Sequence, residues 1–180
     1  MTDSLTTLIF DTSCLSCFAR AGRLALLESL TDGYRRVVTP AVLDELDRGA
    51  ANYPALATVA SVSWLETVRA DDLQVLRTFG RYLQILGGGS RNIGEAATLA
   101  WAEQRQAIAV IDDQTAVTAA RRRGVAVRRT LAVVAGGVDR GQLTEPAAVV
   151  LVDELIAGGA RFPCDGRAFI PWAREQGLLR

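Results

Sequence analysis

The sequence has no histidine and no lysine, so all 20 of its basic side chains are arginine. Without histidine, the chain has no His-based triad, no histidine metal ligand and no histidine general base. Its three cysteines do not make a disulfide framework, and they do not cluster as zinc ligands. Any chemistry must therefore run on carboxylates, hydroxyls or thiols.

Long apolar runs are also missing, because none reaches the roughly 18 residues of a membrane span. The N-terminus shows no basic region followed by an apolar stretch and a cleavage site, so we expect a cytoplasmic protein with no membrane partner. The 20 acidic residues balance the arginines at a formal charge of zero, which excludes an overall basic field for nucleic acid. A local field remains, since five of the nine residues from 121 to 129 are arginine.

What the sequence does contain is a regular alternation of short apolar runs and amphipathic segments over 180 residues. This pattern predicts an α/β fold with three layers and a mainly parallel sheet of four to five strands flanked by helices. We expect strands at 6–10, 36–39, 62–68, 108–111 and 125–127. Helices are expected from about 14, at 23–30, 40–48 and 71–86, from 92, after 113, and at 131–138, 145–157 and 168–176. Residues 50–60 show no clear pattern, and the Gly-Ser stretch 87–90 is a break.

Acidic residues follow two of the predicted strands. Asp11 ends the first strand, and the Asp112–Asp113 pair ends the strand at 108–111. Glu45 and Glu95 lie in the opening turns of predicted helices. Ligand chemistry collects at the carboxyl ends of parallel strands, so these acids reach one cleft if the two strands are neighbours.

Each acid alone also has an ordinary structural explanation. Aspartate is favoured at helix N-caps, which accounts for the acids that follow strands. Glu45 can lie on a solvated helix face, and Glu95 stands three residues after Asn92, the spacing of a capping box. Only the joint pattern favours a shared site.

Several carboxylates in one cleft repel one another, at about 4 kcal/mol for a pair 4 Å apart in an effective dielectric of 20. A protein either protonates some of them or binds a hard divalent cation. Oxygen ligands suit Mg²⁺ or Mn²⁺, which can activate water for phosphodiester hydrolysis.

Five motifs carry these acids and their surroundings: LIFDTS at Asp11, TPAVLDEL at Glu45, GEA at Glu95, VIDD at Asp112–Asp113, and RRRGVAVRRTLAVVAGGVDRGQL after them. Their order resembles the PIN-domain nucleases, in the bacterial branch related to VapC-type toxins. The resemblance covers about residues 5 to 145. It implies that the first and fourth strands are adjacent and that the protein is a metal-dependent endoribonuclease.

The resemblance also implies roles for individual residues. Asp11, Glu45 and Glu95, with Asp112 or Asp113, would be the catalytic residues and the ligands of Mg²⁺ or Mn²⁺. Ser13 matches the small polar residue beside the first aspartate. Family members of the toxin type act on RNA, pair with an antitoxin and commonly form homodimers.

Two departures from the family pattern stand out. Ile111 occupies a position where many relatives carry Thr or Ser, which leaves the choice between Asp112 and Asp113 open. Glu95 is longer than the aspartate often found there. We expect residues 1–144 to form the nuclease domain and 145–180 a helical extension packed on it.

The arginine cluster has two interpretations. Arginine side chains can hold a phosphate backbone close to the acids, or they can form a solvated helix end that the helix dipole favours. The residues concerned are Arg121, Arg122, Arg123, Arg128 and Arg129.

Two other functions compete with a nuclease. One is a PIN-like nucleic-acid-binding or regulatory module that has lost catalysis, favoured by Ile111 and by the capping role of Glu95. The other is a thiol redox protein that uses the C-x-x-C pair Cys14–Cys17.

Overall fold

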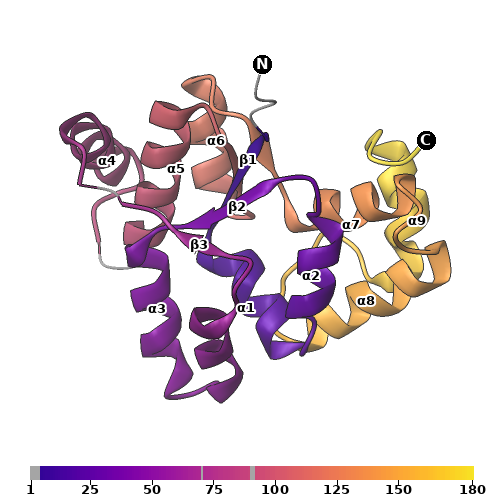
Figure 1. Ribbon diagram of the computed structural model, residues 1–180. Coiled ribbons are helices and arrows are strands. Elements are labelled where there is room, and N and C mark those ends of the chain that lie inside the picture. Colours follow the sequence, from indigo (N-terminus) through magenta and orange to yellow (C-terminus); the bar gives the residue numbers. More distant parts are fainter. Residues whose placement is uncertain (1–4, 70, 90–91) are drawn as a thin grey trace.

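The computed structural model describes residues 5–69, 71–89 and 92–180. Its centre is a parallel sheet in the order β3-β2-β1-β4-β5 (Figure 1). The strands are β1 (Thr7–Phe10), β2 (Arg35–Val38), β3 (Glu66–Thr67), β4 (Ile108–Val110) and β5 (Val127–Arg128). The predicted parallel α/β sheet is confirmed, and β1 and β4 are neighbours.

Helices cover both faces of this sheet. They are α1 (Thr12–Arg20), α2 (Leu24–Leu30), α3 (Pro40–Ala50), the 3₁₀-helix η1 (Pro54–Ser61), α4 (Leu73–Ile85), α5 (Ile93–Arg105), α6 (Gln114–Arg122), α7 (Thr130–Asp139), α8 (Glu145–Ala157) and α9 (Gly166–Glu175). Within the described ranges, none of them is long and apolar enough to cross a membrane.

Side chains that alternate along β1 divide the core in two. Leu8 and Phe10 belong to a cluster with α1, α2, α7 and α8, whereas Ile9 belongs to a cluster with α4, α5 and α6. A parallel strand that is buried on both faces has to be apolar throughout, which is why β1 and β4 are continuous apolar runs.

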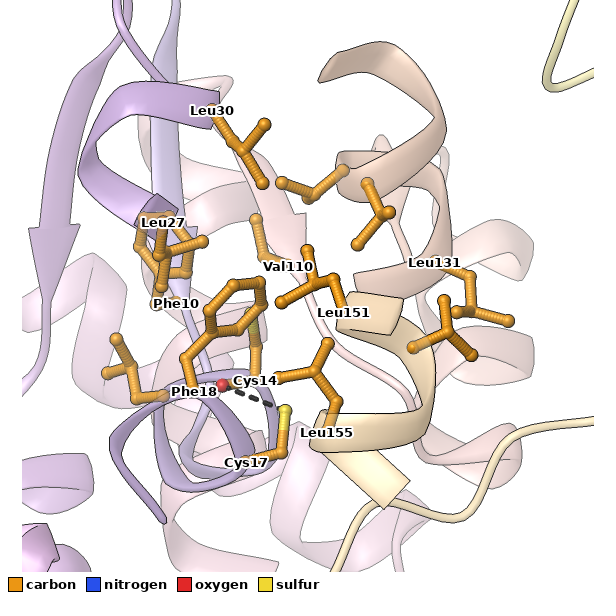
Figure 2. Packing of buried hydrophobic residues seen from close by; sticks show 14 of the residues in the cluster. Phe10, Cys14, Cys17, Phe18, Leu27, Leu30, Val110, Leu131, Leu151 and Leu155 are labelled. Atoms are coloured by element: carbon orange, nitrogen blue, oxygen red, sulfur yellow. Dashed lines mark hydrogen bonds between the residues drawn. The ribbon is translucent and has the colours of Figure 1, made fainter. Parts of the chain in front are cut away.

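The segments at 145–180 contribute to the first of these cores. Leu151 and Leu155 of α8 pack in the same cluster as Phe18 of α1, and Phe169 of α9 is also part of it (Figure 2). Helix α8 therefore lies against α1, and the loop that follows α8 lies near the C-terminal end of α1. The domain boundary at residue 144 stays a prediction.

Three local predictions differ from the structure. The expected strand at 62–68 is reduced to β3 at the sheet edge, and the unassigned stretch before it contains η1. Strand β5 begins two residues later than expected, because the Val125 amide donates to Ala120 O and Gly124 adopts φ 74° to end α6. The predicted break at 87–90 ends at Ser90, which lies outside the described residues.

Candidate functional site

Asp11 is built into the centre of the sheet edge. Its backbone amide donates to the carbonyl of Val110 at 3.0 Å, which fixes it between β1 and β4. Its side chain is only 3% exposed, and Oδ2 accepts hydrogen bonds from the amide (3.1 Å) and hydroxyl (2.9 Å) of Ser13. Oδ1 is buried with no hydrogen-bond partner. Burying a carboxylate oxygen in this way is costly unless something else binds it.

Glu45 reaches the same edge from α3. Its Oε2 accepts a 2.6 Å hydrogen bond from Thr12 Oγ1, and its Oε1 accepts one of 3.0 Å from the Gly94 amide. A Cβ atom on Gly94 would lie 2.6 Å from Oε2, so only glycine lets the carboxylate approach α5 this closely. The glutamate thus joins α1, α3 and α5 at the site.

Glu95 lies half-buried in the first turn of α5. Burial and the charges of Asp11, Asp113 and Glu45 together raise its pKa to about 8. The capping-box interpretation is wrong, because the Asn92 amide donates to Gly89 O and the Asn92 side chain does not cap the helix. Glu95 is therefore available to the acid group.

Asp112 and Asp113 make different contacts although they are adjacent. Asp112 accepts hydrogen bonds from the amide (2.9 Å) and hydroxyl (2.6 Å) of Thr130, and so fixes the start of α7. Asp113 caps α6 by accepting the Ala116 amide at 2.8 Å. Of the two, it is the exposed Asp113 whose charge raises the Glu95 pKa.

We call Asp11, Glu45, Glu95 and Asp113 the acid group. None of the five ion pairs found in the described part of the chain includes one of its members. Burial, with a small contribution from the charge of Glu45, raises the pKa of Asp11 to about 6 despite the opposite effect of the Ser13 hydrogen bonds. In the described part of the chain, no ion pair therefore offsets the repulsion within the acid group.

The side chains of the acid group have the chemistry that a divalent cation needs. All its potential metal ligands are oxygens, and Asp11 Oδ1 is a buried acceptor without a hydrogen-bond partner. Across residues 5–69, 71–89 and 92–180, no three Asp, Glu, Cys or His side chains are already arranged to hold an ion. The hydrogen bonds to Ser13, Thr12 and Ala116 set the present carboxylate directions instead.

The structure does not bring the predicted arginines at 121–123 to the acid group. Helix α6 starts after Asp113 and has nine residues, so its last turn lies roughly 13 Å away along the axis. Arg123 binds Glu103 at 2.6 Å with its guanidinium over the ring of Tyr82, while Arg121 and Arg122 are exposed.

The two arginines that follow β5 have separate positions. The guanidinium of Arg128 lies 5.1 Å from the ring centroid of Tyr34, which precedes β2. Arg129 donates to the side chain of Gln114, the neighbour of Asp113. Only Arg129 is therefore held near the carboxyl edge of the sheet.

A cleft of about 380 Å³ adjoins the acid group. Its lining includes Ser13, Asp112 and Asp113 together with residues that we did not predict from the sequence, namely Thr12, Ser16, Arg20, Arg161 and Phe162. Thr12, Ser16 and Arg20 recur every four residues, a polar stripe along α1 that could have identified them. Arg161 carries no local signal, because only the packing of α8 on α1 brings it here.

Cys14 and Cys17 belong to the core next to this cleft (Figure 2). Burial raises the pKa of both thiols, that of Cys17 to about 12, and Cys17 Sγ donates to the Cys14 carbonyl at 3.2 Å. A redox-active cysteine needs a lowered pKa and access to solvent. The redox alternative therefore has no support in the structure.

Comparison with known families gives one match. The model of a family described as a PIN domain matches residues 7–167. Neither a curated protein nor a solved structure matches the chain. PIN domains are generally nucleases, which act on nucleic acids and typically use divalent metal ions. The VapC-type branch within the family stays a prediction. The fold agrees with this match, because β1 lies beside β4 and acids follow the carboxyl ends of both strands. Since the match covers most of the chain, the chain belongs to the PIN-domain family.

Proposed function

We propose that this protein is an endoribonuclease that depends on Mg²⁺ or Mn²⁺. The observation that carries the proposal is the acid group itself: a buried Asp11 with an unpartnered oxygen, and a Glu95 whose pKa is raised by burial and by the charges of three other carboxylates. Such an arrangement costs stability in the absence of a cation, which is typical of a site and not of a scaffold.

Asp11, Glu45, Glu95 and Asp113 would hold the ion. When bound, a divalent cation lowers the pKa of an attacking water and stabilises the charge of the phosphate and of the departing oxygen. We prefer Asp113 to Asp112 because Asp113 interacts with Glu95, whereas Asp112 uses both oxygens on Thr130.

The remaining residues position these acids. Ser13 donates two hydrogen bonds to Oδ2 of Asp11, and Oδ1 of the same carboxylate stays without a hydrogen-bond partner. Thr12 and the Gly94 amide each donate a hydrogen bond to one oxygen of Glu45, so the orientation of its carboxylate is fixed. Carboxylates that are already oriented in this way do not have to reorganise during the reaction.

An inactive PIN-like module that binds nucleic acid or regulates is the second candidate. The two features that favour it are weakened by the geometry. Glu95 does not take part in a capping box. Ile111 is fully buried in the core with α5 and α6, so it takes no place in the acid group.

We also propose a more specific role, that of the toxin in a toxin–antitoxin pair. This role rests on the resemblance to the VapC-type branch. It predicts that a small protein encoded beside this gene binds the nuclease and inhibits it. Co-expression of the two, followed by co-purification and an RNA cleavage assay, tests this role. A neighbour that neither binds nor inhibits would contradict it.

The test of the nuclease proposal compares the wild type with Asp11→Asn on a structured RNA in Mg²⁺ or Mn²⁺. We expect Asp11→Asn to lose about 100-fold or more of the cleavage, because even residues behind a metal ligand account for 10–100-fold. Asp47→Asn is the matched control, since Asp47 is exposed on the same helix as Glu45. The products should carry 5′-phosphate and 3′-hydroxyl ends.

Equal cleavage by the wild type and Asp11→Asn would overturn the proposal. Calorimetry with Mn²⁺ separates the two candidates independently of RNA. The nuclease binds the ion through Asp11, whereas an inactive module need not bind it.

A further inference from the structure

The cleft beside the acid group has two walls of different origin. One wall is the polar stripe of α1, with Thr12 and Ser16 leading to Arg20. The other is the α8–α9 loop, which contributes Gly158 to Phe162. The acids Asp112 and Asp113 lie at one part of the cleft, and the two arginines Arg20 and Arg161 belong to the same lining.

The guanidinium of Arg20 is held in place without a carboxylate. It stacks on the ring of Tyr53 with 3.8 Å between Cζ and the centroid. In the described part of the chain no ion pair includes Arg20 or Arg161, although five other arginines are paired. Stacking leaves the N–H groups in the guanidinium plane available for an anion.

Two glycines allow the loop to approach Arg20. A Cβ on Gly158 would lie 2.9 Å from the backbone carbonyl of Cys17, and one on Gly159 would lie 2.3 Å from Arg20 Nη1. Gly159 also has φ 99°, which other residues rarely adopt. This close contact places the loop that carries Arg161 directly against the end of α1.

We propose that Arg20 and Arg161 form a subsite for a backbone phosphate of the nucleic-acid strand, next to the acid group that cuts it. The inference rests on the proposed nuclease function and assigns part of substrate binding to the segment after α8. Thr12 and Arg20 are eight residues apart on α1, roughly 12 Å along the helix, so the phosphate bound there is not the one at the acids.

The shape and chemistry of the cleft indicate what part of the substrate it takes. A volume of about 380 Å³ lies at the low end of the range of ligand pockets, which fits a short stretch of one flexible strand. Arginine is the preferred ligand for phosphate, and Phe162 supplies an aromatic ring on which a base can stack. Repulsion from Asp112 and Asp113 keeps the phosphate at the arginine end.

The experiment measures binding of a short fluorescein-labelled oligouridylate in EDTA, where no cleavage takes place, at a series of salt concentrations. Each phosphate contact on a single strand contributes about 0.7 to the slope of log affinity against log salt. The double variant Arg20→Gln/Arg161→Gln loses the contact to one phosphate and should therefore bind more weakly with a slope lower by about 0.7. The control is Arg77→Gln/Arg81→Gln, which removes the same charge from exposed positions on α4, across the sheet.

The outcomes separate this inference from the proposed function. A reduced slope in the α1–loop variant alone supports the subsite, and if the wild type then fails to cut RNA in Mn²⁺, only the nuclease proposal falls. Cleavage by the wild type with an unchanged slope in that variant overturns the subsite alone. Equal loss in the α4 control, or no binding by the wild type, also overturns the subsite. Circular dichroism of each variant confirms that it is folded.

Discussion

Two glutamates on α5 show how differently the ends of one helix are used. Glu103, near the C-terminal end, binds Arg123 through two hydrogen bonds of 2.6 and 2.7 Å and accepts a third from Tyr82, and its pKa is lowered. Glu95, two turns earlier, faces other carboxylates and has its pKa raised to about 8. The same residue type is stabilised as a charge in one place and destabilised in the other.

The difference lies in where the arginines are. The chain has 20 of them, and one is placed against Glu103, whereas no described ion pair reaches the acid group. A single arginine beside Glu95 would have relieved the repulsion. Acids without an arginine partner would leave the proposed metal site open to a cation, at a cost in stability.

The largest expected effect is the contrast in activity between the two glutamates. Glu95→Gln should lower RNA cleavage in Mn²⁺ by about 100-fold or more, because it removes a proposed metal ligand. Glu103→Gln makes the same chemical change on the same helix and should leave cleavage within about twofold of wild type. Equal losses in both variants would show that Glu95 acts through the stability of α5.

A smaller effect on activity is expected from Gly94→Ala. The added Cβ would lie 2.6 Å from Glu45 Oε2 and displace the carboxylate from the Gly94 amide. Cleavage should fall by about 10–100-fold, as for other residues that orient a metal ligand. Gly80→Ala on α4 is the control, since nothing lies within 4 Å of a Cβ there. Unchanged cleavage in Gly94→Ala would exclude a role for the position of Glu45.

The next prediction concerns the free energy of unfolding. Here the larger effect is expected from replacing Glu103 and the smaller one from replacing Glu95. Glu103→Gln removes a partly buried ion pair in which the acid is 19% and Arg123 28% exposed. The free energy of unfolding should fall by about 1–2 kcal/mol, or roughly 3–6 °C in Tm. Urea denaturation measures this directly, and a change below about 0.3 kcal/mol would contradict it.

The last prediction concerns how the stability of the metal-free protein depends on pH. The pKa of Glu95 rises from 4.5 to about 8 on folding, so its contribution to stability is full below 4.5 and is lost as pH rises through 8. Metal-free wild type should therefore lose Tm between pH 5 and pH 8 relative to Glu95→Gln. Saturating Mn²⁺ should reverse that loss at pH 8 in the wild type only. Parallel Tm curves for the two proteins in EDTA would contradict the raised pKa.

Sequence patterns predicted the sheet and the acids for physical reasons that are local. A strand buried on both faces must be apolar, so β1 and β4 are visible as runs, and the acids that follow them lie at the strand ends. The prediction that β1 and β4 are adjacent in the sheet came from the resemblance to PIN domains. The short β3 and β5 were misplaced because two-residue strands have too little pattern to fix their ends.

Contacts between distant segments were the part that sequence could not supply. The five arginines at 121–129 looked like one cluster, but α6 carries Arg121 and Arg122 to the far end of the sheet, and Arg123, which follows the helix, pairs with Glu103. Arg161 reaches the cleft only because α8 packs on α1. The choice between Asp112 and Asp113 likewise depends on Thr130, which is 18 residues away.

The clamp between Asp112 and Thr130 changes how experiments at this pair of acids should be interpreted. Helix α7 packs its apolar side into the larger core, and its first turn is anchored by that one carboxylate. Replacing Asp112 would loosen the scaffold and silence the enzyme at the same time, even if the residue never meets a substrate. An inactive variant at position 112 is thus evidence about folding until its unfolding curve matches that of the wild type, and position 113 needs the same control because Asp113 caps α6.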